Sequence, residues 1–220
     1  MIDALKKQKV YKKVFQDACN QLTMSHMEER FQKSAVTYIK SQNGYRAEIP
    51  FFDEIITMFY PEFKFASSKS TVVNLVTKVI ILHYINHASG RTLSMNQISY
   101  EDIPGCKHYL PVFEKRVTKP LANAFGFNRD AFLEAGESLS GHKEAYGDAS
   151  FTLYALPRVP ITFILWEADE EFPASVKVLF DDTIDGYLPL EDITVIARLA
   201  AMRIIKAAKS LYGPYGEDDL

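Results

Sequence analysis

Residues 70–88, STVVNLVTKVIILHYINHA, form a nearly continuous apolar run in the middle of a chain of 220 residues. The run contains many β-branched residues, which would also suit a buried strand, but its length and the following Gly90 favour a helix. A helix that is apolar on most of its sides is buried on most of its sides. We therefore predict a buried central helix here.

The segments before this run predict two helices followed by short antiparallel strands. Apolar residues recur at helical spacing over residues 2–22, and a second, short helix is expected over 27–33. Between residues 35 and 65 the apolar residues alternate instead, which places one face of each strand inward. The Asn43-Gly44 pair predicts a tight hairpin turn, because both residues tolerate positive φ.

The segments after the run predict more helices, a second group of strands and a long terminal helix. Helices are expected near 112–124 and 129–138, and strands at 150–156, 160–166 and 176–180. Pro189 suits the start of the last helix, whose apolar residues recur at steps of three and four. The predicted fold class is α+β: antiparallel sheets with a buried central helix and a C-terminal amphipathic helix packed on the sheet.

Length and composition predict a single α+β domain over residues 1–220. Hydrophobic residues are 47% and charged residues 24%, which is typical of a globular protein with a substantial core. Within it we expect a helical N-terminal segment at 1–33 and a mobile tail at 213–220. The net charge is −3, and the chain shows neither a secretory signal nor a membrane-spanning apolar stretch. These features predict a cytoplasmic protein that binds neither nucleic acid nor a membrane.

The cysteines and short motifs argue against several classes of enzyme. Cys19 and Cys106 are the only cysteines, too few for an intrinsic iron–sulfur cluster or a zinc ribbon. The sequence contains no nucleophile elbow, no P-loop and no dinucleotide-binding glycine motif. We therefore favour a non-catalytic role.

His83 and His87 lie four residues apart on the predicted central helix, so their rings project from one face. This spacing allows a shared metal ion or a haem-like ligand. The zinc-protease pattern, however, requires a glutamate where Tyr84 stands. The alternative is one hydrogen-bonded, buried histidine and one exposed histidine at the helix end, where a cation is favoured.

Acidic residues follow the predicted strand that ends at Trp166. They are Glu167, Asp169, Glu170 and Glu171. Clustered carboxylates repel one another, so they are either solvated or held together by a cation. Exposed aromatic residues beside acids, here Trp166 and Phe172, are typical of an interface or a ligand rim. A second acidic stretch, residues 181–192, partly fits a calcium loop, from which Thr183 and Asp192 depart, and the favoured alternative is a turn that leads into a capped helix.

Several stretches resemble a family of uncharacterised bacterial and archaeal domains, the domain-of-unknown-function family 3786. They are residues 80–84, 98–100, 103–105, 148–151, 156–160, 165–173, 179–181 and 187–189, within a region of about 70–211. Some members of that family are fused to a four-iron, four-sulfur domain of the corrinoid-protein type. The resemblance thus implies a role near corrinoid chemistry in anaerobes, with an iron–sulfur or corrinoid protein as partner, and it implies no particular activity.

We predict an accessory domain that binds a cofactor, such as a tetrapyrrole or corrinoid, or a partner protein, in a cleft between the central helix and the C-terminal sheet. The expected ligand-binding residues are His83, Tyr100, Trp166, Glu167 and Asp169. One alternative is a hydrolase or transferase whose divalent metal, held by Glu170 and Asp181 with their acidic neighbours, lowers the pKa of a bound water. Another alternative is a structural protein–protein interaction module.

Overall fold

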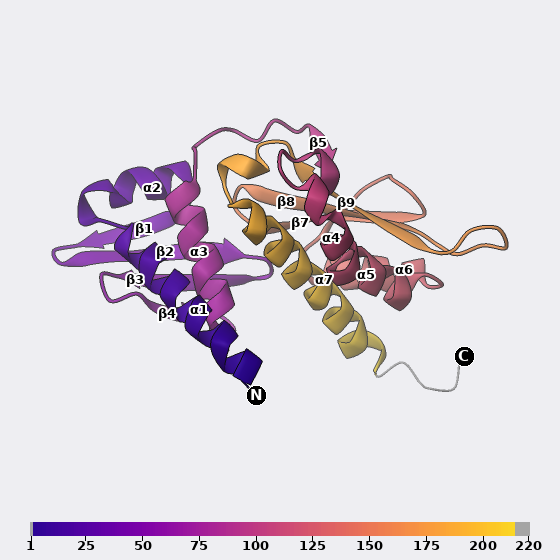
Figure 1. Cartoon of the computed structure of the whole chain (residues 1–220), viewed down its shortest axis with the longest axis horizontal. Helices are drawn as coiled ribbons and strands as arrows, with labels where there is room; N and C mark the ends of the chain where they lie inside the picture. Colours follow the sequence, from indigo (N-terminus) through magenta and orange to yellow (C-terminus); the bar gives the residue numbers. More distant parts are fainter. Residues whose placement is uncertain (1, 214–220) are drawn as a thin grey trace. The chain divides into compact units, whose positions relative to one another are not determined.

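The computed structural model describes the backbone of residues 2–213 and the side chains of residues 9–213. The chain divides into two compact units (Figure 1). Unit 1 comprises the described part of Met1–Leu93 together with Leu156–Arg158 and Thr183–Asp192, and unit 2 comprises the remainder. A single domain over the whole chain stays a prediction. The tail expected at 213–220 lies, beyond Gly213, outside the described residues.

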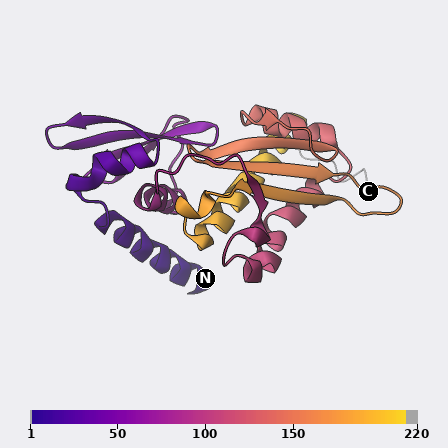
Figure 2. The same cartoon turned by 90° about the horizontal axis from the view of Figure 1, so that it is seen from above.

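Unit 1 contains a four-stranded antiparallel sheet and the predicted helices. In chain order its elements are α1 (Ile2–Asn20), α2 (Met27–Lys33), β1 (Thr37–Ser41), β2 (Gly44–Phe51), β3 (Glu54–Tyr60), β4 (Lys64–Ser67) and α3 (Leu75–His87). Neighbours in sequence are neighbours in the sheet, so the strand order is β1-β2-β3-β4. Both views show α1 and α3 on the same side of this sheet (Figures 1 and 2). The predicted helices and alternating strands of this region are confirmed.

The β1–β2 hairpin needs its glycine for a different reason from the one expected. Ser41 pairs with Gly44, so the turn consists of Gln42 and Asn43, and Gly44 belongs to the strand. A Cβ atom at Gly44 would lie 2.0 Å from the carbonyl oxygen of Tyr60 on β3. The close approach of β3, and not a positive φ, therefore requires glycine here.

Helix α3 is the predicted central helix, and its start is fixed by a cap. The Asn74 side chain accepts a hydrogen bond from the backbone N–H of Thr77 at 2.9 Å, so the helix begins at Leu75 and not at 70. Ile81, Leu82 and Ile85 are completely buried. The prediction of a buried central helix is confirmed.

Unit 2 contains a five-stranded antiparallel sheet and the remaining helices. Its strands are β5 (Gln97–Ser99), β6 (His142–Lys143), β7 (Ala149–Leu156), β8 (Val159–Trp166) and β9 (Ser175–Asp181), in the order β5-β9-β8-β7-β6. Its helices are α4 (Leu110–Arg116), α5 (Thr118–Phe125), α6 (Arg129–Ser138) and α7 (Leu190–Tyr212), which enters unit 2 at Ile193. The α+β fold class with antiparallel sheets is thus confirmed, and each unit has its own sheet.

Helix α7 is the predicted C-terminal amphipathic helix. Its apolar stripe, which includes Ile196, Ala200 and Ile204, is completely buried. Both views show the helix beside the larger sheet, with its axis inclined to the strands (Figures 1 and 2). Among residues 2–213, no helix combines the length and apolar character needed to cross a membrane.

The helix predicted at 112–124 is wrong in one respect, because the chain forms two helices there. Helix α4 ends and α5 begins around Val117, whose backbone angles are not helical. Pro120 explains the break: inside a continuous helix its ring would clash with the carbonyl of Arg116. In the first turn of α5 a proline costs no hydrogen bond.

The buried Tyr187 side chain should stabilise unit 1. Its side chain is fully buried, its ring stacks on Tyr84 at a centroid distance of 5.9 Å, and its hydroxyl donates to the Arg91 carbonyl oxygen. We expect Tyr187→Ala to lower the free energy of unfolding by about 3–5 kcal/mol through the cavity it leaves. Tyr187→Phe keeps the ring and should cost only about 1 kcal/mol. Urea unfolding measures both, and equal effects of the two variants would contradict the packing role.

The two thiols should be unreactive in the folded protein. Cys19 is 6% exposed and Cys106 is 1% exposed. Burial raises the pKa of the Cys19 thiol to about 11, so very little of the reactive thiolate forms at pH 8. We expect slow reaction with Ellman's reagent at pH 8 and prompt reaction of both thiols in urea. Rapid native labelling of either cysteine would show that its surroundings open easily.

Candidate functional site

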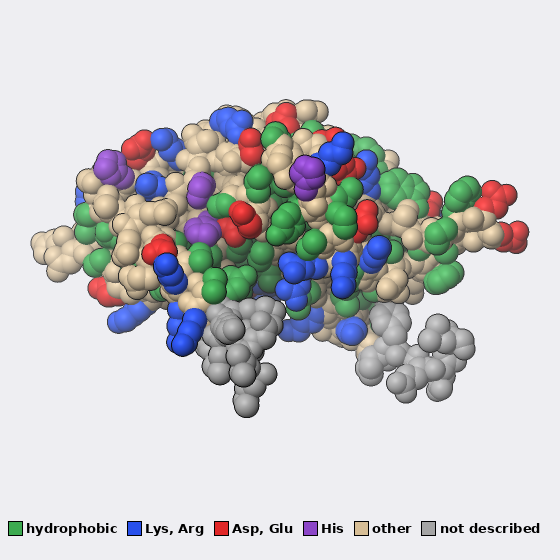
Figure 3. Space-filling model, viewed as in Figure 1, with side chains coloured by type: hydrophobic (Ala, Val, Ile, Leu, Met, Phe, Trp, Pro, Cys, Tyr) green, Lys and Arg blue, Asp and Glu red, His purple; other side chains and the backbone are tan. Residues whose placement is uncertain are grey.

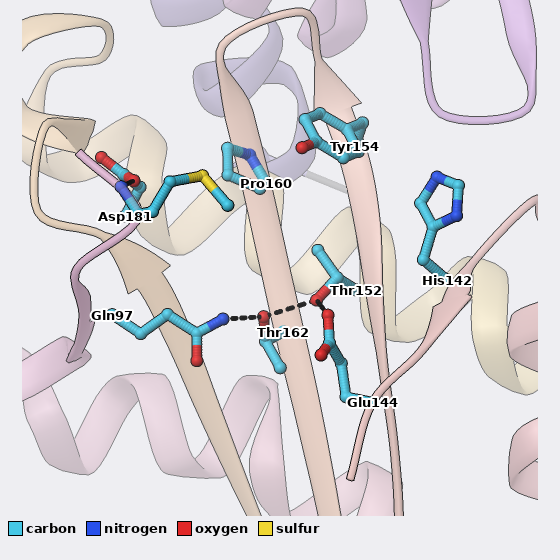
Figure 4. Close-up of a pocket in the computed structure, with 9 residues that line it drawn as sticks. Gln97, His142, Glu144, Thr152, Tyr154, Pro160, Thr162 and Asp181 are labelled. Atoms are coloured by element: carbon cyan, nitrogen blue, oxygen red, sulfur yellow. Dashed lines mark hydrogen bonds between the residues drawn. The ribbon is translucent and has the colours of Figure 1, made fainter. Parts of the chain in front are cut away.

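A pocket of about 210 Å³ lies on the five-stranded sheet of unit 2 (Figure 4). We call it the sheet pocket. Its lining residues are Met95, Gln97, His142, Glu144, Thr152, Tyr154, Pro160, Thr162 and Asp181. Each of the five strands contributes at least one of them. The site is therefore built by the sheet as a whole.

The alternation of β7 and β8 places polar side chains in this pocket. Phe151 and Phe163 occupy positions of the opposite pleat and are buried in the apolar core. The intervening positions carry Thr152, Tyr154 and Thr162, which line the pocket. Thr152 is 7% exposed and Thr162 only 2%, so both hydroxyl groups are buried and require hydrogen-bond partners.

A chain of hydrogen bonds crosses the floor of the pocket (Figure 4). Gln97 Nε2 donates to Thr162 Oγ1 at 2.9 Å, the two threonine Oγ1 atoms are 2.7 Å apart, and Thr152 Oγ1 donates to Glu144 Oε1 at 2.8 Å. An ionised carboxylate only accepts, so the Thr152 proton points to Glu144, and Thr162 must then donate to Thr152. The chain therefore runs in one direction, from the Gln97 amide to the Glu144 carboxylate.

The charge of the lining is negative. Glu144 and Asp181 both line the pocket, and neither lysine nor arginine does. Asp181 also holds the preceding loop, because its carboxylate accepts hydrogen bonds from the backbone N–H groups of Ser94 (3.2 Å) and Met95 (2.8 Å). Glu144 is thus the carboxylate that faces the hydrogen-bond chain, while Asp181 helps to build the wall.

Two aromatic rings stand at one side of the pocket. The His142 and Tyr154 rings meet edge to face at a centroid distance of 6.2 Å, and both side chains are exposed. Figure 4 shows them on neighbouring strands beside the polar floor. An exposed tyrosine face next to carboxylates suits the binding of a cationic group.

Two of the predicted ligand-binding residues come together elsewhere in unit 2. Tyr100 and Trp166 both line a groove of about 330 Å³ beside β9. The Tyr100 ring stacks on Phe113 at 4.0 Å, and its hydroxyl lies 2.7 Å from Thr194 Oγ1. Burial raises the pKa of Tyr100 to about 12. Tyr100 is therefore mainly a core residue, whereas Trp166 is 38% exposed at the edge of the groove.

Glu167 and Asp169, also predicted as ligand-binding residues, organise the β8–β9 connection. Glu167 Oε1 accepts from the backbone N–H of Arg129 at 2.9 Å. Asp169 Oδ1 accepts from the backbone N–H groups of Glu171 (2.8 Å) and Phe172 (2.6 Å). Neither acid lines the sheet pocket or the groove beside β9. Acidic and apolar side chains are exposed at the tip of this connection (Figure 3).

His83 belongs to unit 1, as does its partner Asp192. His83 Nδ1 lies 2.5 Å from Asp192 Oδ2, while His87 is the last residue of α3 and is exposed. Partial burial of the His87 ring and the nearby His83 lower the pKa of His87. This arrangement agrees with a hydrogen-bonded histidine followed by an exposed one at the helix end.

The residues proposed for a metal do not converge on one point. Glu170 precedes β9 in the exposed connection and Asp181 ends that strand, which has seven residues and so is about 20 Å long. One ion cannot contact both. Within residues 9–213, no three or more His, Cys, Asp or Glu side chains are grouped to hold a metal ion.

The acids of the calcium-like stretch also have separate partners. Asp185 pairs with Arg91 at 2.5 Å, and Asp192 pairs with His83. Asp181, at the start of the stretch, accepts hydrogen bonds from the loop before β5. These contacts agree with the alternative reading, in which a turn leads into α7.

The sheet pocket was not predicted from the sequence. Thr152, Tyr154 and Thr162 did carry a signal, because polar residues at every second position interrupt otherwise apolar strands. The sequence around Gln97 and Glu144 shows no such alternation. Strand β5 has three residues and β6 only two, too few to show alternation.

The fold and the pocket define an α+β protein with two antiparallel sheets and a pocket on the five-stranded sheet. The domain of unknown function DUF3786 matches residues 26–203, more than half of the chain, and this chain belongs to that family. The resemblance noted in the sequence is thereby confirmed. The searches of curated proteins and of solved structures gave no significant match.

The buried threonine pair should contribute to stability. Thr162→Val keeps the shape of the side chain but leaves the Gln97 amide and Thr152 without their shared partner, so the free energy of unfolding should fall by about 1–3 kcal/mol. Thr37→Val on β1 is the matched control, because Thr37 is exposed, and should change stability by less than about 0.5 kcal/mol. Urea unfolding of both variants provides the comparison, and a neutral Thr162→Val would refute the hydrogen-bond chain.

Proposed function

We propose that this protein is an accessory binding protein whose sheet pocket holds a small organic cation, a primary ammonium or guanidinium compound. The one-way hydrogen-bond chain from Gln97 to Glu144 carries this proposal. Each threonine hydroxyl donates its only proton to another member of this row of hydrogen bonds. The Glu144 carboxylate, in contrast, accepts a hydrogen bond from Thr152 and has the capacity for more. The Glu144 end of the floor therefore favours a ligand that brings hydrogen-bond donors.

The charge and the rim of the pocket support a cation among such donors. The Glu144 carboxylate lines the pocket, and neither a lysine nor an arginine is among the lining residues. A charge-assisted hydrogen bond between a cationic donor and a carboxylate is about twice as strong as a neutral one. The exposed Tyr154 ring adds an aromatic face on which an ammonium or guanidinium group can rest.

The size of the pocket favours a small ligand over a tetrapyrrole. Pockets for drug-sized molecules have volumes of about 300–1,000 Å³ and mostly apolar linings. The sheet pocket has about 210 Å³, which lies below this range. A corrinoid or haem, the cofactor class expected from the resemblance, is larger than this space. An iron–sulfur or corrinoid protein as physiological partner, and a cytoplasmic location, stay predictions.

The proposal is tested by calorimetry and thermal shift with ligands of defined charge. The panel contains a diamine, an aminoalkyl guanidine, an uncharged diol of similar length, a dicarboxylate and cobalamin. We expect only the two cationic ligands to bind, and a ligand at 100 times its Kd should stabilise the protein by about 2.7 kcal/mol. Glu144→Gln should weaken their binding at least tenfold, because it removes the charge and one acceptor.

Glu101→Gln is the matched control. Glu101 is exposed and lines the groove beside β9, so this variant should bind the cations as the native protein does. The proposal would be overturned if neither of the two cations bound. Binding that Glu144→Gln leaves unchanged, or stabilisation by cobalamin alone, would overturn it as well.

A further inference from the structure

We infer that His83 and His87 form a binding site for a divalent transition metal ion of the zinc, nickel or copper type. The site lies in unit 1 and is independent of the sheet pocket. Both histidines belong to the last turns of α3, four residues apart, so their side chains share one face of the helix. Figure 3 shows histidine side chains exposed over α3, next to an acidic side chain.

The distance between the two rings suits a shared ion. Their centroids are 6.2 Å apart and their planes are inclined at 80°. An ion at zinc–nitrogen distances of about 2.0–2.1 Å reaches both rings when one nitrogen of each ring is directed at the other ring, which rotation of the exposed His87 side chain provides. A pair of histidines one helical turn apart on a well-buried helix is also held at a fixed spacing by the helix backbone.

Asp192 acts as a positioning residue for His83. Its Oδ2 atom lies 2.5 Å from His83 Nδ1, and the aspartate is 8% exposed. With Nδ1 engaged, the nitrogen left for an ion is Nε2. Histidines that bind metals usually donate their other ring N–H to a carboxylate in this way, which fixes the ring and raises its basicity.

The two rings are accessible to an ion from solvent. The His83 side chain is 19% exposed and His87 is exposed at the helix end. The His87 ring contacts the His83 ring, and it makes no hydrogen bond to another residue within 9–213. Its nitrogens are therefore available without the cost of breaking an interaction within residues 9–213.

The site provides two protein ligands and leaves the other positions open. No third His, Cys, Asp or Glu of the described residues completes a metal-binding group. The remaining positions would hold water or an external anion. Arg30 lies close enough for its positive charge to affect His87. This charge weakens the binding of a metal ion alone and favours the binding of an anion beside the metal. Imidazole ligands select zinc, nickel and copper over magnesium and calcium.

The test uses the untagged, chelator-treated full chain and isothermal titration with Zn²⁺ and Ni²⁺. We expect saturable binding of one ion per chain that excess Mg²⁺ does not displace. His87→Ala should weaken binding at least tenfold, because His87 is exposed and its loss does not disturb the core. Asp192→Asn should weaken binding about 10–100-fold, as expected for a carboxylate that orients a ligand.

His108→Ala is the matched control, because His108 is exposed in unit 2 and should not affect the titration. Nitrogen-15 spectra of the imidazole groups give a second measurement, in which Zn²⁺ should shift Nε2 of His83 and a nitrogen of His87. Equal losses in His108→Ala and His87→Ala would reveal scattered surface binding and overturn the inference. Unshifted His83 and His87 resonances, or the absence of saturation, would overturn it too.

Discussion

The Tyr84 hydroxyl is the interaction on which unit 1 depends, because it connects three segments that are far apart in the sequence. It donates to the Ser34 carbonyl oxygen at 2.6 Å and accepts from the Arg158 backbone N–H at 3.1 Å, while the ring stacks on Tyr187. The side chain is completely buried, and this burial raises its pKa. A buried hydroxyl must be paired, so the three segments are held in one arrangement. His83, the residue just before Tyr84, and Asp192 depend on the same arrangement.

Unit 2 depends on a sheet that has apolar side chains on one face and polar side chains on part of the other. The apolar positions of β7 and β8 form the core, and the intervening positions form the polar pocket. Polar groups buried on a sheet are costly unless their hydrogen bonds are satisfied, and here Gln97, Thr162, Thr152 and Glu144 satisfy one another. The hydrogen bonds of the pocket floor are thus satisfied among the lining residues, and the Glu144 carboxylate at the end of this hydrogen-bond chain can accept more. For this reason we propose a ligand that donates hydrogen bonds.

The family that the chain belongs to is described as a domain of unknown function, so function here rests on the geometry of sites. Glu167 and Asp169, in the acidic stretch after Trp166, were predicted from the sequence to bind a ligand. In the structure Glu167 and Asp169 accept backbone N–H groups and shape a connection. Carboxylates serve turns as readily as ligands, because both tasks require hydrogen-bond acceptors, and only the partners distinguish the two.

The sequence by itself determined the fold class and most of the elements, because helix and strand periodicity follow from local geometry. The central helix, the alternating strands and the amphipathic C-terminal helix were all predicted, and even the break before Pro120 follows from local rules. Tertiary structure alone decided the sites. The sheet pocket joins Gln97 to Thr162 and Thr152 to Glu144, and the histidine site joins His83 to Asp192 across 109 positions. Strand order and the pairing of distant side chains depend on packing, which no local spacing encodes.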